Sequence, residues 1–131
     1  FQNFSFNFDS AAGIIYTVDV TKPKGEKVTI ISMADGTPFS MDKMYNVALN
    51  SYRGNGGGEL LTKGAGIPQD ELKGRILFST DKDLRYYLMQ YIEKKGVIEP
   101  HALGQWKFIP EEWVEPAAKR DYEYLFGKVE K

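Results

Sequence analysis

The sequence predicts an α+β fold (broadly α/β), in which helices pack on a mixed or antiparallel β-sheet. The first third of the chain holds runs rich in β-branched and aromatic residues, separated by glycine and proline, which is typical of strands joined by turns. The second half holds two stretches with helical periodicity. With 131 residues, 42% of them hydrophobic, the chain can bury a core without disulfides or metal. We expect residues 1–131 to form a single domain or part of one.

The predicted sheet is built from three runs near the N-terminal end. Residues 14–20 and 27–33 lie at hairpin distance from each other. Residues 34–37 follow with an Asp-Gly pair, which suits a tight turn. Residues 45–51 alternate apolar and polar side chains, so one face of a third strand would be apolar. A further short strand is expected over residues 75–78.

Two helices are expected after the sheet. The clearer one follows Thr80, a candidate N-cap, and ends before Gly96. Its apolar residues recur at spacings of three and four, so we predict a core-facing stripe rather than a cofactor site. These residues are Leu84, Leu88, Tyr91 and Ile92. A second helix, with a structural role, is expected from about Pro116 through Phe126.

Composition and charge exclude several classes of function. The 17 lysines and arginines nearly balance the 18 aspartates and glutamates, so the net charge provides no general electrostatic attraction to a nucleic acid duplex or to anionic lipid. No stretch approaches 18 consecutive apolar residues, so no membrane span is expected. A single His without any Cys cannot build a transition-metal site. We therefore expect His101 to lie in a surface loop, and we expect this chain to hold no cofactor. The first residue is Phe without a signal peptide behind it, so we expect a fragment of a longer, processed protein.

A glycine-rich segment, residues 54–66, holds the one candidate site. A P-loop would need Lys and then Ser or Thr after the glycines, whereas Gly58 is followed by Glu59, and no dinucleotide fingerprint is present. The predicted strand end Asn50-Ser51-Tyr52-Arg53 offers a flat ring and a guanidinium, and the glycines offer accessible backbone N–H groups. Such a set suits a flat, polar, anionic ligand. On composition alone, a plain hairpin loop is the favoured alternative.

At these residues the sequence resembles the C-terminal domain of the 5′-nucleotidase family. The resemblance runs from about Phe6 to about Leu60. It rests on Asn7-Phe8-Asp9, Gly13, Tyr16, Val18-Asp19-Val20-Thr21, Pro23, Val47-Ala48-Leu49-Asn50-Ser51-Tyr52-Arg53 and Gly56-Gly57-Gly58. The Asn-Phe-Asp segment and the Tyr-Arg before three glycines are most similar to the 2′,3′-cyclic-nucleotide 2′-phosphodiesterase/3′-nucleotidase branch. Many 5′-nucleotidases have Gly-Gly-Asp where this chain has three glycines, which also favours that branch.

The resemblance implies a periplasmic, secreted or cell-surface enzyme that hydrolyses phosphate esters of nucleotides. An upstream metallophosphoesterase domain of the same protein would carry two divalent metals and the catalytic residues, outside this chain. This chain would then be the C-terminal part of the substrate-binding domain, with no catalytic residue of its own and a nucleotide or nucleoside as ligand. The base would stack on Tyr52, and the second ring that the family supplies would lie before Phe1.

The resemblance also implies a set of substrate-binding residues. They are Asn50, Ser51, Tyr52, Arg53, Gly56, Gly57 and Gly58 around the glycine-rich segment, with Asn7, Phe8 and Asp9 as the other wall. Structural alternatives stay open: Asn7 and Asp9 as turn-forming residues, Phe8 as core, and Arg53 paired with Glu59 at the surface. A different class of function also stays open. In it, Tyr52 and the glycine-rich segment serve a structural module or one that contacts protein or carbohydrate.

Overall fold

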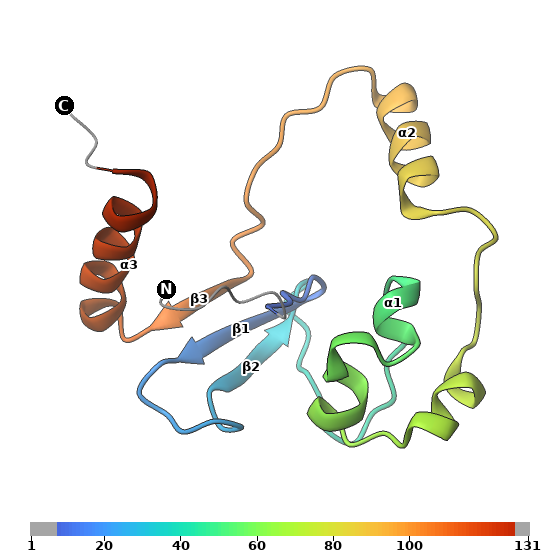
Figure 1. Ribbon diagram of the computed structural model, residues 1–131, viewed down its shortest axis with the longest axis horizontal. Helices are drawn as coiled ribbons and strands as arrows, with labels where there is room; N and C mark the ends of the chain where they lie inside the picture. Colours follow the sequence, from blue (N-terminus) through green and yellow to red (C-terminus); the bar gives the residue numbers. More distant parts are fainter. Residues whose placement is uncertain (1–7, 128–131) are drawn as a thin grey trace. The chain divides into compact units, whose positions relative to one another are not determined.

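The computed structural model describes residues 8–127 (Figure 1). The chain divides into two compact units. The first unit consists of the chain up to Lys43 together with the chain from Ala102 onward, and the second unit is Met44–His101. Strands and helices occur together, which confirms the predicted α+β class. The expectation of one domain or partial domain stays a prediction.

A three-stranded mixed sheet forms the centre of the first unit, in the order β2-β1-β3. Strand β1 (Ile14–Asp19) pairs antiparallel with β2 (Val28–Met33), as the sequence predicts. Strand β3 (Trp106–Ile109) pairs parallel with the other edge of β1, where Tyr16 lies opposite Trp106. Because β1 is paired on both edges, it holds the best-buried side chain of this unit, Tyr16.

The predicted turn after β2 is confirmed. Gly36 has φ of +85°, in the left-handed region that glycine enters without a steric penalty. Two hydrogen bonds close the turn, from Gly36 N–H to Met33 O at 3.0 Å and from Met33 N–H to Thr37 O at 2.9 Å. Asp35 reinforces it, since its Oδ1 accepts from Thr37 N–H at 2.9 Å and from Thr37 Oγ1 at 2.6 Å.

The end of β1 repeats this Asp-x-Thr arrangement. Asp19 Oδ1 accepts from Thr21 Oγ1 at 2.7 Å and from Thr21 N–H at 3.0 Å. These hydrogen bonds favour the ionised carboxylate, so the hydroxyl of Thr21 and then its backbone N–H lower the pKa of Asp19. Thr37 lowers the pKa of Asp35 in the same way.

Replacing Thr21 with valine is expected to raise the pKa of Asp19 toward its ordinary value, because the substitution removes the stronger donor and keeps the backbone N–H. A carboxyl whose pKa is depressed in the folded state stabilises the fold above its unfolded pKa, and this stabilisation is lost as pH falls through the folded pKa. The variant should therefore lose less stability on acidification. Carboxyl ¹³C shifts measured against pH check this, with Asp35 as the internal control; an unchanged Asp19 pKa would contradict it.

Helix α3 (Glu111–Phe126) follows β3 in the first unit. The predicted start at Pro116 is wrong, since the helix begins earlier and Pro116 lies inside it. Glu111 and Glu112 occupy the first turn, where negative side chains complement the positive end of the helix dipole. Proline is favoured in the first turn of a helix, where its missing N–H is not needed. Here Pro116 lies beyond the first turn, so taking it as the start of the helix gave the wrong boundary.

The second unit is made of helical segments. These are α1 (Ser51–Gly54), the short 3-10 segments η1 (Gly57–Glu59) and η3 (Gln69–Arg75), the π turn η2 (Leu60–Gly64), and α2 (Leu84–Lys95). The predicted strands over residues 45–51 and 75–78 are wrong. Residues 44–50 are irregular and run into α1, and residues 76–78 have no strand pairing in the described chain. Alternation shows that a strand is possible, but a strand also needs a paired neighbour.

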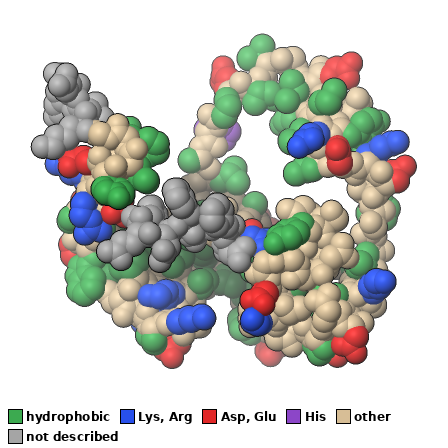
Figure 2. All heavy atoms as spheres, in the orientation of Figure 1, with side chains coloured by type: hydrophobic (Ala, Val, Ile, Leu, Met, Phe, Trp, Pro, Cys, Tyr) green, Lys and Arg blue, Asp and Glu red, His purple; other side chains and the backbone are tan. Residues whose placement is uncertain are grey.

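Helix α2 is present where the sequence predicts it, with a different N-cap and a different environment. Asp83, rather than Thr80, caps it, because its side chain accepts from Tyr86 N–H at 2.9 Å. The helix ends at Lys95, directly before Gly96, as predicted. The prediction that its apolar stripe is core is wrong for the described structure, in which no residue of α2 is buried. Figure 2 shows apolar side chains at the surface in the region where Figure 1 places α2. Periodicity shows which side of a helix is apolar, but it does not supply the surface that would cover it.

Candidate functional site

Tyr52 and Arg53 lie in α1, at the start of the glycine-rich segment. Asn50 is the N-cap of this short helix, and its Oδ1 accepts from Arg53 N–H at 2.8 Å. Asparagine favours this geometry because its short side chain can satisfy a free N–H of the first turn. The prediction that Tyr52 stands at a strand end is therefore wrong, and the cap at Asn50 is the physical reason. Ser51 is the exposed first residue of the helix.

Arg53 is buried, with 8% of its surface exposed. Its Nη1 donates to Gly57 O at 3.1 Å, and its Cζ lies over the Tyr52 ring, 5.5 Å from the ring centre. Glu59, the alternative surface partner, forms an ion pair with Lys63 at 2.7 Å. Arg53 thus connects α1 to the glycines that follow it, rather than standing at the surface.

Tyr52 is the exposed ring of the site, with 62% of its surface accessible. It lies directly against Gly57: a Cβ atom at Gly57 would fall 2.5 Å from Tyr52 Cε2 and 2.6 Å from Tyr52 O. The ring therefore contacts the backbone at Gly57 and has the Arg53 guanidinium over it, while most of its surface stays exposed. A flat ring held on a local backbone scaffold can stack on another flat ring.

Gly56 and Gly58 turn the chain beside Tyr52. Both have φ in the left-handed region, +92° and +68°, which residues with a Cβ atom rarely adopt. Gly56 also packs closely on η3, since a Cβ there would fall 2.5 Å from Gln69 Oε1 and 3.1 Å from Leu72 Cδ1. Gln69 Nε2 in turn donates to Asn55 O at 3.0 Å. Segment η3 thus supports the backbone that carries the glycines.

The other predicted site residues lie in or near the first unit. Asn7 lies outside the described residues. Phe8 is a half-exposed member of an aromatic cluster, which we define as Phe8, Tyr16, Trp106 and Phe108. The Phe8 ring centre lies 5.6 Å from Trp106 and 6.2 Å from Phe108, and Trp106 stacks on Tyr16 at 5.9 Å. Asp9 is exposed next to this cluster. Their role as a wall of the ligand site stays a prediction.

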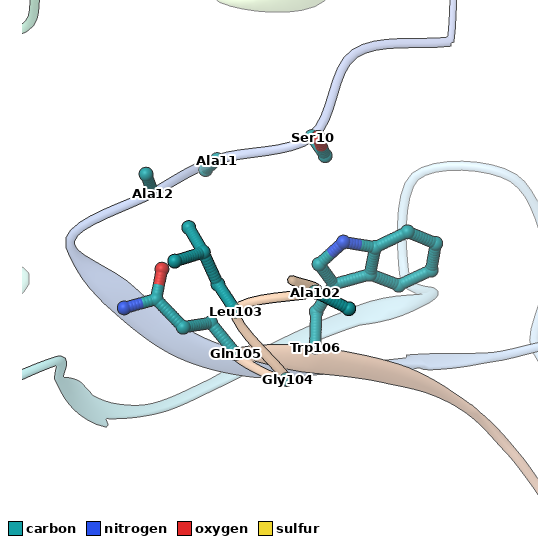
Figure 3. Close-up of a pocket in the computed structure, with 8 residues that line it drawn as sticks. All are labelled: Ser10, Ala11, Ala12, Ala102, Leu103, Gly104, Gln105 and Trp106. Atoms are coloured by element: carbon teal, nitrogen blue, oxygen red, sulfur yellow. The ribbon is translucent and has the colours of Figure 1, made fainter. Parts of the chain in front are cut away.

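An open cavity of about 450 Å³ lies beside Trp106 in the first unit, and sequence reasoning missed it. Its walls are the stretches Ser10–Ala12 and Ala102–Trp106 (Figure 3). The indole of Trp106 borders the cavity on one side. Leu103, in the segment that precedes β3, points toward Ala11 and Ala12. Gln105 Oε1 accepts from Gly13 N–H at 3.3 Å, which ties the two walls together. The run of small residues was the only signal in the sequence, and such runs are common in loops.

His101 is exposed in an irregular stretch, as predicted. Among residues 8–127, no three His, Cys, Asp or Glu side chains come together in a way that could hold a metal ion. Across the same described range, no helix has the length and apolar character needed to cross a bilayer. The chemistry that the second unit offers at its glycine-rich segment is ring stacking and hydrogen bonding by the backbone.

Comparison with known proteins identifies the segment that carries this site. Residues 2–63 match the family described as 5′-nucleotidase, C-terminal domain. Residues 2–63 thus belong to the 5′-nucleotidase C-terminal domain family. The match confirms the resemblance found in the sequence, and it includes every predicted site residue.

Two curated relatives extend the similarity over more of the chain. The trifunctional nucleotide phosphoesterase protein YfkN of Bacillus subtilis (strain 168) is 31% identical over 121 residues, which are 83% of this chain and 8% of that protein. The 2′,3′-cyclic-nucleotide 2′-phosphodiesterase/3′-nucleotidase of Haemophilus influenzae is 26% identical over 121 residues, which are 81% of this chain and 17% of that protein. The chain therefore spans less than a fifth of the length of either relative. No solved structure matches the chain.

Proposed function

We propose that this 5′-nucleotidase C-terminal segment binds a nucleotide or nucleoside, with its base stacked on Tyr52. The observation that carries the proposal is the exposed Tyr52 ring, held against Gly57 within the family-matched segment. Stacking a base on an aromatic side chain is worth about 1–3 kcal/mol and tolerates any base, because every base has a flat π face. A single ring therefore supports weak binding that depends little on the identity of the base.

The neighbouring residues have separate roles in this proposal. Asn50 caps α1 and so sets the direction of the helix that carries Tyr52. Ser51 is exposed beside Tyr52, and the backbone of Gly56 to Gly58 shapes the site next to the ring. Arg53 supports the site as a buried side chain that donates to Gly57 O. Phe8 and Asp9, with Asn7, stay predicted ligand contacts.

We assign phosphate ester hydrolysis to the larger protein of which such a segment forms a part. The names of both relatives describe phosphoesterases that act on nucleotides. In our proposal two divalent metals and the catalytic residues belong to an upstream metallophosphoesterase domain, and the whole protein is secreted, periplasmic or attached to the cell surface. The described residues offer no metal ligand set, so no step of the hydrolysis is assigned to them. Metal-dependent phosphate release by the purified chain would contradict this division of roles.

Replacing Tyr52 with alanine is expected to weaken the binding of adenosine and 3′-AMP by about 5- to 150-fold, the loss that corresponds to one stacking contact. Backbone amide shifts of residues 51–58, followed by NMR during titration with each ligand, measure this. Tyr124→Ala removes an exposed tyrosine from α3 and should leave the affinity unchanged.

Two outcomes would contradict the proposal. One is the absence of shifts in the wild-type chain at millimolar ligand, which would favour a structural or interaction module that uses the same surface. The other is an equal affinity in the wild type and in Tyr52→Ala, which would place the ligand elsewhere.

A further inference from the structure

We infer that Gly57 is the positioning residue of the site: together with Arg53 it holds the Tyr52 ring so that one ring face is presented to the ligand. This inference rests on the proposed function for the ligand, but the contacts that hold the ring stand on their own. Three observations support it. They are the backbone conformation at residue 57, the lack of room for a Cβ atom there, and the hydrogen bond from Arg53 to Gly57 O.

Backbone conformation does not explain why residue 57 is glycine. Its neighbours Gly56 and Gly58 both have positive φ, whereas Gly57 is not among the described residues with positive φ. An alanine could therefore adopt the backbone angles of residue 57. The requirement must come from what surrounds the residue.

The missing side chain at Gly57 leaves room for the Tyr52 ring. A Cβ atom would fall 2.5 Å from Cε2 and 2.6 Å from Cδ2 of that ring, and 2.6 Å from Tyr52 O. Carbon atoms in contact are about 3.5–4.0 Å apart, so a Cβ and the ring cannot both keep these positions. The ring can turn away and so relieve the contacts with its carbons, whereas the contact with Tyr52 O is relieved only by a shift of the backbone. Any side chain at residue 57 would thus displace the ring from its present orientation.

Arg53 fixes both partners of this contact. Its Nη1 donates to Gly57 O at 3.1 Å, which holds residue 57 at the ring edge. Its Cζ lies over the Tyr52 ring at 5.5 Å from the ring centre, within the range of a cation–π attraction. With the guanidinium over one face and Gly57 at one edge, the ring keeps the opposite face for a ligand, consistent with its exposure. The site therefore takes one flat ring on one face of Tyr52.

A ring held in this way loses less conformational freedom when a ligand stacks on it. Immobilising a side chain on binding weakens affinity by about twofold to tenfold. Gly57→Ala is therefore expected to weaken 3′-AMP binding by at least about this factor, measured by NMR titration of the 131-residue chain. Gly54→Ala is the matched control, because Gly54 has no positive φ and, apart from its chain neighbours and its own helix backbone, no atom within 4 Å of its Cβ position. It should bind 3′-AMP as the wild type does.

A double-substitution cycle distinguishes positioning from general damage to the loop. If Gly57 acts through the ring, Gly57→Ala should change affinity by less than about twofold when Tyr52 is already alanine. An equal loss in both backgrounds would overturn the inference, and so would wild-type affinity in Gly57→Ala alone.

A measurement on the wild-type chain tests the ring position without any ligand or variant. Nuclear Overhauser contacts between the Tyr52 ring protons and the Gly57 Hα protons are expected, and their absence from an assigned spectrum would overturn the inference. This result decides the matter if Gly57→Ala does not fold. If the contacts are present and the wild type binds no 3′-AMP, the proposed function fails while the positioning of the ring stands. If the wild type binds and the contacts are absent, the inference alone fails.

Discussion

Replacing Tyr16 with alanine is expected to lower the free energy of unfolding of the first unit by about 3–5 kcal/mol, the usual cost of removing a buried aromatic side chain. Tyr16 lies in the central strand β1 with 7% of its surface exposed. Its ring stacks on Trp106 of β3, and its hydroxyl accepts from Ala11 N–H at 3.2 Å. The substitution would therefore remove a contact between strands together with the tie to the segment before β1. Since single domains are stable by about 5–15 kcal/mol, this is a large fraction of the total.

Denaturant unfolding followed by tryptophan fluorescence measures this loss, because Trp106 lies next to the substituted ring. Tyr16→Phe keeps the ring and should cost only about 1 kcal/mol for the lost hydrogen bond. Tyr124→Ala removes an exposed tyrosine of α3 and should stay within about 0.5 kcal/mol of the wild type. If Tyr16→Ala were as stable as Tyr124→Ala, Tyr16 would not be part of the core of this unit.

Replacing Leu72 with alanine is expected to destabilise the second unit by about 2–5 kcal/mol. Leu72 lies in η3 and is 5% exposed, and its Cδ1 would lie 3.1 Å from a Cβ atom at Gly56. The side chain therefore supports the backbone of the glycine-rich segment as well as the core. We expect the substitution to loosen that segment and so to weaken ligand binding, although Leu72 touches no ligand in our proposal.

Amide hydrogen exchange over residues 51–75, compared with the wild type, measures this effect residue by residue. Exchange should become faster around Gly56 and throughout η3. Leu77→Ala is the matched control, because Leu77 is 79% exposed and its truncation should change little. Unchanged protection in Leu72→Ala would show that the glycine-rich segment does not depend on η3.

The local part of the fold could be predicted from the sequence. Strands β1 and β2 and the Asp35-Gly36 turn depend on residues close together in the chain, and their patterns identified them. Strand β3 joins β1 from far along the chain, and its four residues show too short a pattern to predict a partner. The strand expected over residues 45–51 failed because the side chain of Asn50 caps a helix, which overrides the alternation before it.

The candidate site shows the same division. The resemblance pointed to the segment and to Tyr52 as a ligand-binding ring, and the family match confirms the resemblance. The exposure of the ring comes from the structure, and its role in binding stays a prediction. Periodicity and composition could not show that Arg53 is buried or that Gly57 lies against the ring, because both depend on packing between residues four or five positions apart in an irregular turn. In the same way, the pattern of α2 identified its apolar stripe but not its surroundings.

The place of β3 in the chain also determines the order in which the first unit can be completed during synthesis. A two-stranded hairpin is marginally stable in water, so β1 and β2 gain most of their support only once a third strand joins them. Strand β3 emerges from the ribosome after all of Met44–His101. The hydrogen bond from Gly13 N–H to Gln105 Oε1 likewise joins residues 92 positions apart in the sequence. Contacts over such separations form slowly, because a long loop must close first. All residues of the second unit are therefore synthesised before the last strand of the sheet.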